Sequence, residues 1–384
     1  MASDDWALIV GIRVYPGFDR DREPLRGPEN DAIAFAEWVC SPVGGNVPAD
    51  PYVARHITAK HGPIPNPNSG EFARGHVALI LSSQFTPPAF PTPTDGQPAA
   101  GIIVRAFNRL MDLAEKEFEK NGRRRIGRRL YLFFSGHGLQ PGLQQQDVAV
   151  YTADAAINRP GNHFLAPDWA RHFFRAGVFD EVILFMDCCR GPVTGTTPAR
   201  HPYGRANTPG NHCVFGFGSM PELNAYEKLM PDGRVHGVFS WMLLKGLAGA
   251  AAPPDSYGQI TAGDLAGWMN ENIDSFLTTK ERKDSSIPKE FDFDFRPVDS
   301  ELVLTVIPTG APSSPVHVHL SPRRSPMTLE VRDGELKIRQ QATGTTADLR
   351  LSLPMGRYFA CVLEDGLQQN FEVAGTGEAV YVEL

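Results

Sequence analysis

The sequence lacks the cysteine pattern of a disulfide-rich or zinc-binding protein. It has only five cysteines in 384 residues, an odd number that includes the adjacent pair Cys188 and Cys189. Such sparse thiols do not make a disulfide framework, so they indicate a reducing compartment. No CxxC pair or cluster of His and Cys with metal-ligand spacing occurs. We therefore predict no structural metal and no cofactor.

Long hydrophobic runs and an excess of basic residues are also missing. No stretch approaches the ~18 apolar residues of a membrane-spanning helix. The N-terminus, Met1–Asp5, has neither the basic nor the apolar region of a signal peptide. The 37 Lys and Arg are outnumbered by 44 Asp and Glu, whereas nucleic-acid-binding domains are usually basic. We expect a cytoplasmic protein that binds neither membranes nor nucleic acid.

What the sequence does contain is an alternation of short apolar runs and helical patterns. The runs that predict buried strands are Trp6–Ile12, Val77–Leu81, Leu130–Phe134, Val182–Met186 and Val214–Phe217. The segments with helical spacing are Pro28–Cys40, Ile102–Lys120, Val235–Leu247 and Leu265–Leu277, the last with Thr261 as N-cap. This order predicts a mostly parallel sheet flanked by helices. A nucleotide-binding fold is excluded because Gly11–Gly17 matches neither a GxGxxG turn nor a P-loop.

The character of the sequence changes after about residue 300. Alternating or β-branched segments replace the helical patterns: Leu302–Val306, Val316–Leu320, Leu336–Ile338, Leu349–Leu353, Tyr358–Leu363 and Ala379–Leu384. They predict a small all-β domain of the sandwich type. We therefore divide the chain into an α/β domain, residues 1–306, and an all-β accessory domain, residues 307–384.

Two of the predicted strands are followed directly by reactive side chains. The strand ending at Phe134 leads into Ser135-Gly136-His137-Gly138, and the strand ending at Met186 leads into Asp187-Cys188-Cys189-Arg190-Gly191. Functional groups of open parallel sheets gather beyond the carboxyl ends of the strands. Because the two strands are expected to be neighbours, His137 and Cys189 should face each other across a cleft.

A thiol beside an imidazole can perform nucleophilic catalysis. The imidazole takes the thiol proton during attack and later protonates the leaving amine. The backbone N–H groups of Gly138 and Cys189 would stabilise the oxyanion, an effect worth ~3 kcal/mol per donor. Taken singly, His137 could be a structural histidine and Cys189 inert packing. Their joint position after two buried strands favours catalysis.

Several segments resemble the caspase-like cysteine peptidases, over roughly residues 5–305. The similar segments are Ala7–Ile12, Leu25–Ala32, the histidine motif Phe134–Gly138, the cysteine motif Asp187–Gly191 and Gly237–Leu244. The resemblance implies a caspase-like fold and a cysteine endopeptidase. It also implies that Cys189, two residues after Asp187, is the nucleophile and that Cys188 turns into the fold.

The metacaspase branch of this family implies a substrate specificity. Its acidic S1 pocket accepts Arg or Lys, and the matching positions here are Asp31, Asp187 and the hydroxyl of Ser135. Carboxylates facing a guanidinium form charge-assisted hydrogen bonds. Asp31 could instead only complement a helix dipole. Caspases use arginines to bind a P1 aspartate; Arg190 follows the nucleophile directly and Arg13 has no evident partner, so we favour a basic P1 residue.

Two features depart from the family or extend it. The segment after the histidine is rich in Gln, and Asp147, Asp154 and Asp168 are scattered, so we expect no calcium requirement. The long loop Pro192–Asn211 contains Arg200 and Arg205, which are candidate self-processing sites if the loop is not inert surface.

The partners implied by the resemblance are protein or peptide substrates and an upstream activating protease, in a bacterial stress or defence pathway. The alternative is a catalytically silent scaffold that binds partners through its β domain.

Overall fold

The computed structural model divides the chain into two compact units. One contains residues 1–244 and 269–302, and the other contains residues 245–268 and 303–384. The residues described are 4–18, 23–49, 53–54, 72, 75–85, 95–141, 147–156, 161–191, 211–253, 256, 258–296, 301–307, 314–322, 325–333, 338–345, 347–354, 356–373 and 379–384.

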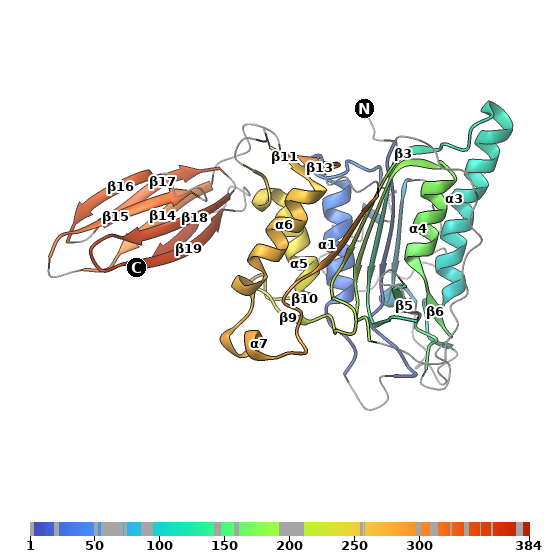
Figure 1. Cartoon of the computed structure of the whole chain (residues 1–384), viewed down its shortest axis with the longest axis horizontal. Helices are drawn as coiled ribbons and strands as arrows, with labels where there is room; N and C mark the ends of the chain where they lie inside the picture. Colours follow the sequence, from blue (N-terminus) through green and yellow to red (C-terminus); the bar gives the residue numbers. More distant parts are fainter. Residues whose placement is uncertain are drawn as a thin grey trace. The chain divides into compact units, whose positions relative to one another are not determined.

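A six-stranded sheet forms the centre of the first unit (Figure 1). Five of its strands are parallel: β1 (Trp6–Gly11), β2 (Val77–Leu81), β3 (Gly127–Ser135), β7 (Phe179–Asp187) and β8 (His212–Phe217). The sixth, β12 (Asp292–Arg296), pairs antiparallel with β8. The order across the sheet is β12-β8-β7-β3-β1-β2. β1 and β2 are buried along their whole length, as expected for strands covered on both faces.

Helices cover both faces of this sheet (Figure 1). On one face lie α1 (Pro28–Cys40) and α5 (Val238–Lys245); on the other lie α3 (Ala100–Asn121) and α4 (Ala166–Arg175). Aromatic side chains fill both layers. The ring of Phe35 on α1 stacks 4.7 Å from that of Phe133 on β3, and the ring of Phe107 on α3 stacks 5.6 Å from that of Phe173 on α4. These layers hold the carboxyl ends of the strands in place.

The described residues also form several smaller elements. Three short sheets contain β4 (Gly138–Leu139), β5 (Ala149–Tyr151) and β6 (His163–Phe164); β9 (Glu227–Leu229) and β10 (Val235–Gly237); and β11 (Gln259–Thr261) and β13 (Val303–Val306). The remaining helices are α6 (Ala262–Asn272), α7 (Thr279–Lys283), a π-helical turn (Gly246–Ala250) and 3₁₀ turns at Ser82–Gln84 and Ile273–Phe276.

The C-terminal part is built mostly from antiparallel strands, with β20 pairing parallel to β14. A three-stranded sheet has the order β17-β14-β20 and a four-stranded sheet the order β16-β15-β18-β19. The strands are β14 (Ser314–Leu320), β15 (Met327–Asp333), β16 (Ile338–Gly344), β17 (Ala347–Leu353), β18 (Gly356–Val362), β19 (Leu367–Val373) and β20 (Val380–Glu383). Side chains such as Val316, Val331 and Val362 come from both sheets into one core, which is the arrangement of a sandwich.

The predicted fold class is confirmed: a mostly parallel sheet flanked by helices, followed by antiparallel β-sheets. The helix predicted over Val235–Leu247 is wrong at its start, because residues 235–237 form β10. The chain division at residue 306 stays a prediction. No helix among the described residues is long and apolar enough to cross a membrane.

Candidate active site

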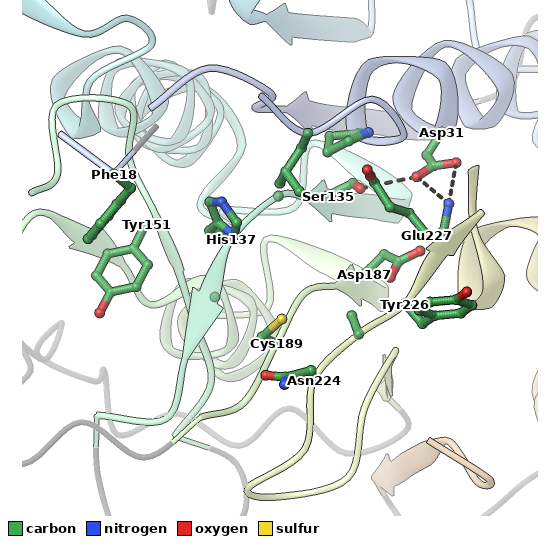
Figure 2. A pocket seen from close by; sticks show the side chains of 16 residues that line it. Phe18, Asp31, Ser135, His137, Tyr151, Asp187, Cys189, Asn224, Tyr226 and Glu227 are labelled. Atoms are coloured by element: carbon green, nitrogen blue, oxygen red, sulfur yellow. Dashed lines mark hydrogen bonds between the residues drawn. The ribbon is translucent and has the colours of Figure 1, made fainter. Parts of the chain in front are cut away.

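A pocket of about 500 Å³ lies where β3 and β7 end (Figure 2). All six side chains or backbone groups predicted for catalysis and for S1 line it: Asp31, Ser135, His137, Gly138, Asp187 and Cys189. Arg200 and Arg205 lie outside the described residues. The structure thus brings together every predicted site residue that it describes.

The strand register explains why the two motifs meet. Ser135 at the end of β3 pairs with Asp187 at the end of β7, and with Gly11 on β1. The N–H of Gly136 then donates to the carbonyl of Asp187 at 3.2 Å. Since His137 and Cys189 each lie two residues beyond this pair, both reach the same pocket.

His137 is held by its backbone and by an aromatic wall. Its N–H donates to Tyr15 Oη at 2.9 Å, and its carbonyl accepts from the N–H of Tyr151 at 2.8 Å. The rings of Tyr15 and Phe18 lie 4.8 and 6.3 Å from the imidazole. Phe18 and Tyr151 line one side of the pocket, while the carboxylates lie beyond His137 on the other (Figure 2). The imidazole therefore lies between an apolar and an acidic end.

The hydrogen-bond pattern around Gly138 turns its N–H toward the cysteine loop. β4 and β5 are antiparallel, with Gly138 opposite Val150. The N–H of Tyr151 donates to the carbonyl of His137, so these two opposite residues form a hydrogen-bonded pair. Because hydrogen-bonded and non-hydrogen-bonded pairs alternate along an antiparallel ladder, Gly138 and Val150 form a non-hydrogen-bonded pair. The N–H of Gly138 therefore points away from β5. Two residues on, the N–H of Gln140 donates to the carbonyl of Gly191 at 2.9 Å. The N–H of Gly138 shares that side of the strand.

Gly138 also packs too closely against this loop to carry a side chain. A Cβ at this position would lie 2.5 Å from the carbonyl oxygen of Cys189 and 2.7 Å from Cys188 Sγ. Real Cβ atoms essentially never come that close to other heavy atoms. Only glycine therefore fits at position 138, where the histidine motif packs against the cysteine motif.

The adjacent cysteines have different environments. Cys188 is 1% exposed and belongs to the hydrophobic core under the sheet, whereas Cys189 is partly exposed and lines the pocket. Burial raises the pKa of the Cys189 thiol, and a hydrogen bond from the backbone of Ala225 only partly offsets this. The thiol is thus protonated in the empty pocket and needs a base during attack.

Asp31 lies at the centre of the acidic end. It is in the first turn of α1, and its Oδ2 accepts a hydrogen bond from Ser135 Oγ at 3.2 Å. Its Oδ1 lies 2.8 Å from Nδ1 of His236, and the N–H of Gly237 donates to both oxygens. Burial raises the pKa of Asp31 to about 6 although these hydrogen bonds favour the carboxylate. Asp31 thus makes side-chain contacts besides lying in the first turn of α1; its S1 role stays a prediction.

Asp187 forms the second buried acidic group. Its Oδ2 accepts from both the N–H and the hydroxyl of Ser240 in α5, at 3.0 and 2.6 Å. Burial and then the negative charge of Asp31 raise its pKa to about 7. The two carboxyls therefore resist being ionised together in an empty pocket. An entering cation would remove that resistance.

Two further residues of the acidic end were missed by the sequence analysis. Glu227 lines the pocket from β9, and its carboxylate accepts from the N–H groups of Arg26 and Gly27 at 3.2 and 2.9 Å. His236 lies on the paired strand β10. Their segment carried no recognised motif, and the strand that positions His236 was predicted as helix.

Neither arginine considered for an aspartate pocket lines this one. Arg190 is fully buried; its guanidinium pairs with Asp292 of β12 at 2.6 Å and donates to the carbonyl of Ser219. Arg13 does have a partner, contrary to the sequence interpretation, since it lies 3.9 Å from Glu29. Among the described residues that line the pocket, none is Lys or Arg.

The scattered aspartates after the histidine serve other contacts. Asp154 accepts hydrogen bonds from Thr152 and Asn162, and Asp168 pairs with Arg171 at 3.2 Å. Within the described ranges, no group of three or more His, Cys, Asp or Glu is arranged to hold a metal ion. The calcium independence of the protein stays a prediction.

No family model matches the sequence, and no curated protein is similar to it. Among solved structures, the chain is similar to caspase-1 from Spodoptera frugiperda at 11% identity and a TM-score of 0.42, over 79% of this chain and 91% of that one. It is also similar to a structural-genomics target from Geobacter sulfurreducens at 13% identity and a TM-score of 0.40, over 79% and 99% of the two chains. Similarities this distant bear on neither activity nor site residues.

Proposed function

We propose that the protein is a cysteine endopeptidase that cleaves after basic residues, Arg and also Lys. One observation carries the proposal: His137 and Cys189 share a pocket with the buried carboxyls of Asp31 and Asp187. The first pair supplies a nucleophile and a base. The second pair supplies a counter-charge for a cationic side chain.

The reaction follows from the positions of these groups. His137 takes the proton of the Cys189 thiol as the sulfur attacks the peptide carbonyl carbon. The N–H groups of Gly138 and Cys189 receive the oxyanion of the tetrahedral intermediate. The intermediate collapses to a thioester, and the imidazolium gives its proton to the departing amine. A water molecule deprotonated by His137 then hydrolyses the thioester and restores the thiol.

The acidic end accounts for the choice of substrate. A guanidinium or ammonium group entering between Asp31 and Asp187 gains charge-assisted hydrogen bonds and relieves the repulsion between the carboxyls. A P1 aspartate would add another negative charge to this place. The pocket therefore favours a basic P1 residue over an acidic one.

The first experiment compares three fluorogenic peptides that differ only at P1, with Arg, Lys or Asp, on the full-length protein. We expect cleavage of the Arg and Lys peptides and none of the Asp peptide. Cys189→Ala should abolish cleavage. The matched control is Cys188→Ala, which should lower thermal stability and leave cleavage largely intact. Full activity in Cys189→Ala would disprove the proposal, and inactive wild type would favour the scaffold alternative.

The activation and the cellular role are proposals that rest on the sequence resemblance. An Arg-directed enzyme would cleave its own chain after Arg200 and after Arg205. Intact mass spectrometry of wild type and Cys189→Ala tests this: fragments ending at either residue should form only in wild type. An upstream protease would act on the same loop, in a stress or defence pathway.

A further inference from the structure

A buried histidine links the floor of the pocket to the protein surface. His236 is 3% exposed, and its two ring nitrogens contact two different carboxylates. Nδ1 lies 2.8 Å from Asp31 Oδ1, and Nε2 lies 3.0 Å from Oδ2 of Asp232, whose side chain is 36% exposed. Asp31 in turn accepts from Ser135, so one hydrogen-bonded chain runs from Asp232 into the pocket.

The two contacts of this histidine favour one protonation state while both carboxyls are ionised. A neutral imidazole has a single N–H, whereas two carboxylates at hydrogen-bond distance each need a donor. His236 satisfies both only as the doubly protonated imidazolium. It then supplies a positive charge behind Asp31. The described residues that line the pocket include three carboxyls and no Lys or Arg.

We propose that His236 is a positioning residue for substrate selection: as an imidazolium it holds Asp31 ionised and oriented for the P1 cation. This inference rests on the function proposed above and adds a residue to it. His236 does not touch the reacting atoms. It acts through Asp31, and Asp232 holds the imidazolium from the other side.

The charges around His236 support this assignment. His236 contacts Asp31 of α1 and Asp232 of its own turn, and it pairs with Lys228 across the β9–β10 ladder. The other charged groups on these elements and at the end of β7 are Glu37, Asp187, Glu227 and Arg234. Lys228 is bonded to Glu281 at 2.7 Å, and Arg234 interacts with Glu37. The ring of Trp241 lies 5.3 Å away. Burial lowers the pKa of His236, but the hydrogen bonds and charges of Asp31 and Asp232 outweigh it and raise the pKa.

The proposal predicts a specific change in the pH dependence of cleavage. Substrate binding needs ionised Asp31, so kcat/KM for the Arg peptide falls as the pH drops through the pKa of that carboxyl. In His236→Ala the carboxyl loses a charge-assisted hydrogen bond and protonates at higher pH. We expect the acidic limb of kcat/KM to move up by about one pH unit. KM should rise about fivefold at pH 6, because the ionised fraction of Asp31 falls from about one half to about one tenth, and kcat should change little.

Two other variants separate positioning from packing. His236→Asn keeps an N–H donor toward Asp31 without the charge, so its acidic limb should lie between those of wild type and His236→Ala. Asp232→Asn weakens the outer contact and should shift the limb in the same direction. A His236→Ala protein that is less stable but keeps the wild-type pH profile would overturn the proposal.

A measurement without substrate keeps the two proposals distinguishable. The histidine ring signals of full-length Cys189→Ala can be titrated by long-range ¹H–¹⁵N NMR, with His236 assigned by its loss in His236→Asn. We expect an imidazolium at neutral pH whose pKa drops by about one unit in Asp31→Asn. A neutral His236 that ignores Asp31→Asn would refute the inference even for an active peptidase. If the NMR result holds but no Arg peptide is cleaved, the proposed protease function has failed and His236 positions Asp31 for another cation.

Discussion

At the scale of the residue, the site depends on two glycines, which have no side chain, as much as on the reactive side chains. Gly136 has a φ of 155°, and the hydroxyl of Tyr15 occupies the place where its Cβ would be. That hydroxyl accepts a hydrogen bond from the backbone N–H of His137. The glycines before and after the histidine therefore allow its segment to pack against Tyr15 and the cysteine loop.

Replacing Gly138 by Ala tests this close approach. The new methyl group would force Gly138 away from Cys188 and Cys189 and displace one oxyanion donor. We expect kcat for the Arg peptide to fall about 10²-fold or more. Gly101→Ala on α3 is the control, because a Cβ there meets nothing within 4 Å. It should leave kcat unchanged and raise stability by about 0.5–1 kcal/mol. Equal kcat in the two variants would exclude Gly138 from the oxyanion site.

At the scale of the element, α5 fixes the orientation of Asp187. The helix starts immediately after Gly237, and its first turn presents both the N–H and the hydroxyl of Ser240 to one carboxylate oxygen. These hydrogen bonds favour the ionised form and oppose the effect of burial. The start of α5 is thus part of the pocket although Ser240 does not line it.

Removing the hydroxyl in Ser240→Ala should weaken this support while the helix persists. A hydrogen bond to a charged group contributes about 1.5–3 kcal/mol, so we expect kcat/KM for the Arg peptide to fall at least tenfold, through KM. Ser240→Thr, which keeps the hydroxyl, should retain more activity if its methyl group is accommodated. Peptide kinetics measure both; a change in kcat alone would contradict the role assigned to Ser240.

The elements also show how much of the fold the sequence revealed. The helix over Pro28–Cys40 and the strand over Val77–Leu81 were predicted with their observed bounds. Both have strong local signals, a Gly-Pro start and an unbroken apolar run. β10 was read as helix because Val235-His236-Gly237 runs directly into α5, and only its pairing with β9 makes it a strand.

The same limit applies to the site. His137, Cys189 and Asp187 could be predicted because each follows a buried strand within a short motif. Glu227, which lines the pocket, and His236, which contacts Asp31, could not, because they lie on a hairpin that is far from both motifs in the sequence. Their place depends on long-range contacts, such as the hydrogen bonds of Glu227 to Arg26 and Gly27.

At the scale of the whole molecule, the acidic pocket costs stability. Burial raises the pKa of Asp31 to about 6 and of Asp187 to about 7, above the ~4 of an unfolded chain. Between pH 4 and 7 the folded state therefore binds more protons than the unfolded state. The free energy of unfolding contributed by these groups falls as the pH rises through that window.

Asp187→Asn should restore, at alkaline pH, the stability that the folded protein loses when Asp187 ionises. The amide keeps an acceptor for Ser240 and cannot ionise, so we expect the Tm at pH 8 to rise by on the order of 5 °C, with little change at pH 5. Cleavage of the Arg peptide should be lost. Asp112→Asn, an exposed carboxylate on α3, is the control and should alter the Tm equally at both pH values. Thermal melts at the two pH values decide the matter; an Asp187→Asn protein less stable at pH 8 than wild type would contradict it.

The ion pair of Arg190 with Asp292 bears on when the cysteine loop can fold during synthesis of the chain. Arg190 follows the nucleophile, but Asp292 lies about a hundred residues later in the chain, on the strand that completes the edge of the sheet. A nascent chain that ends before β12 carries His137 and Cys189 yet leaves a buried guanidinium without its carboxylate, a costly state. We therefore expect the cysteine loop to gain its folded contacts only after residue 292 has been translated, which for the proposed peptidase would delay proteolysis until the first unit is nearly complete.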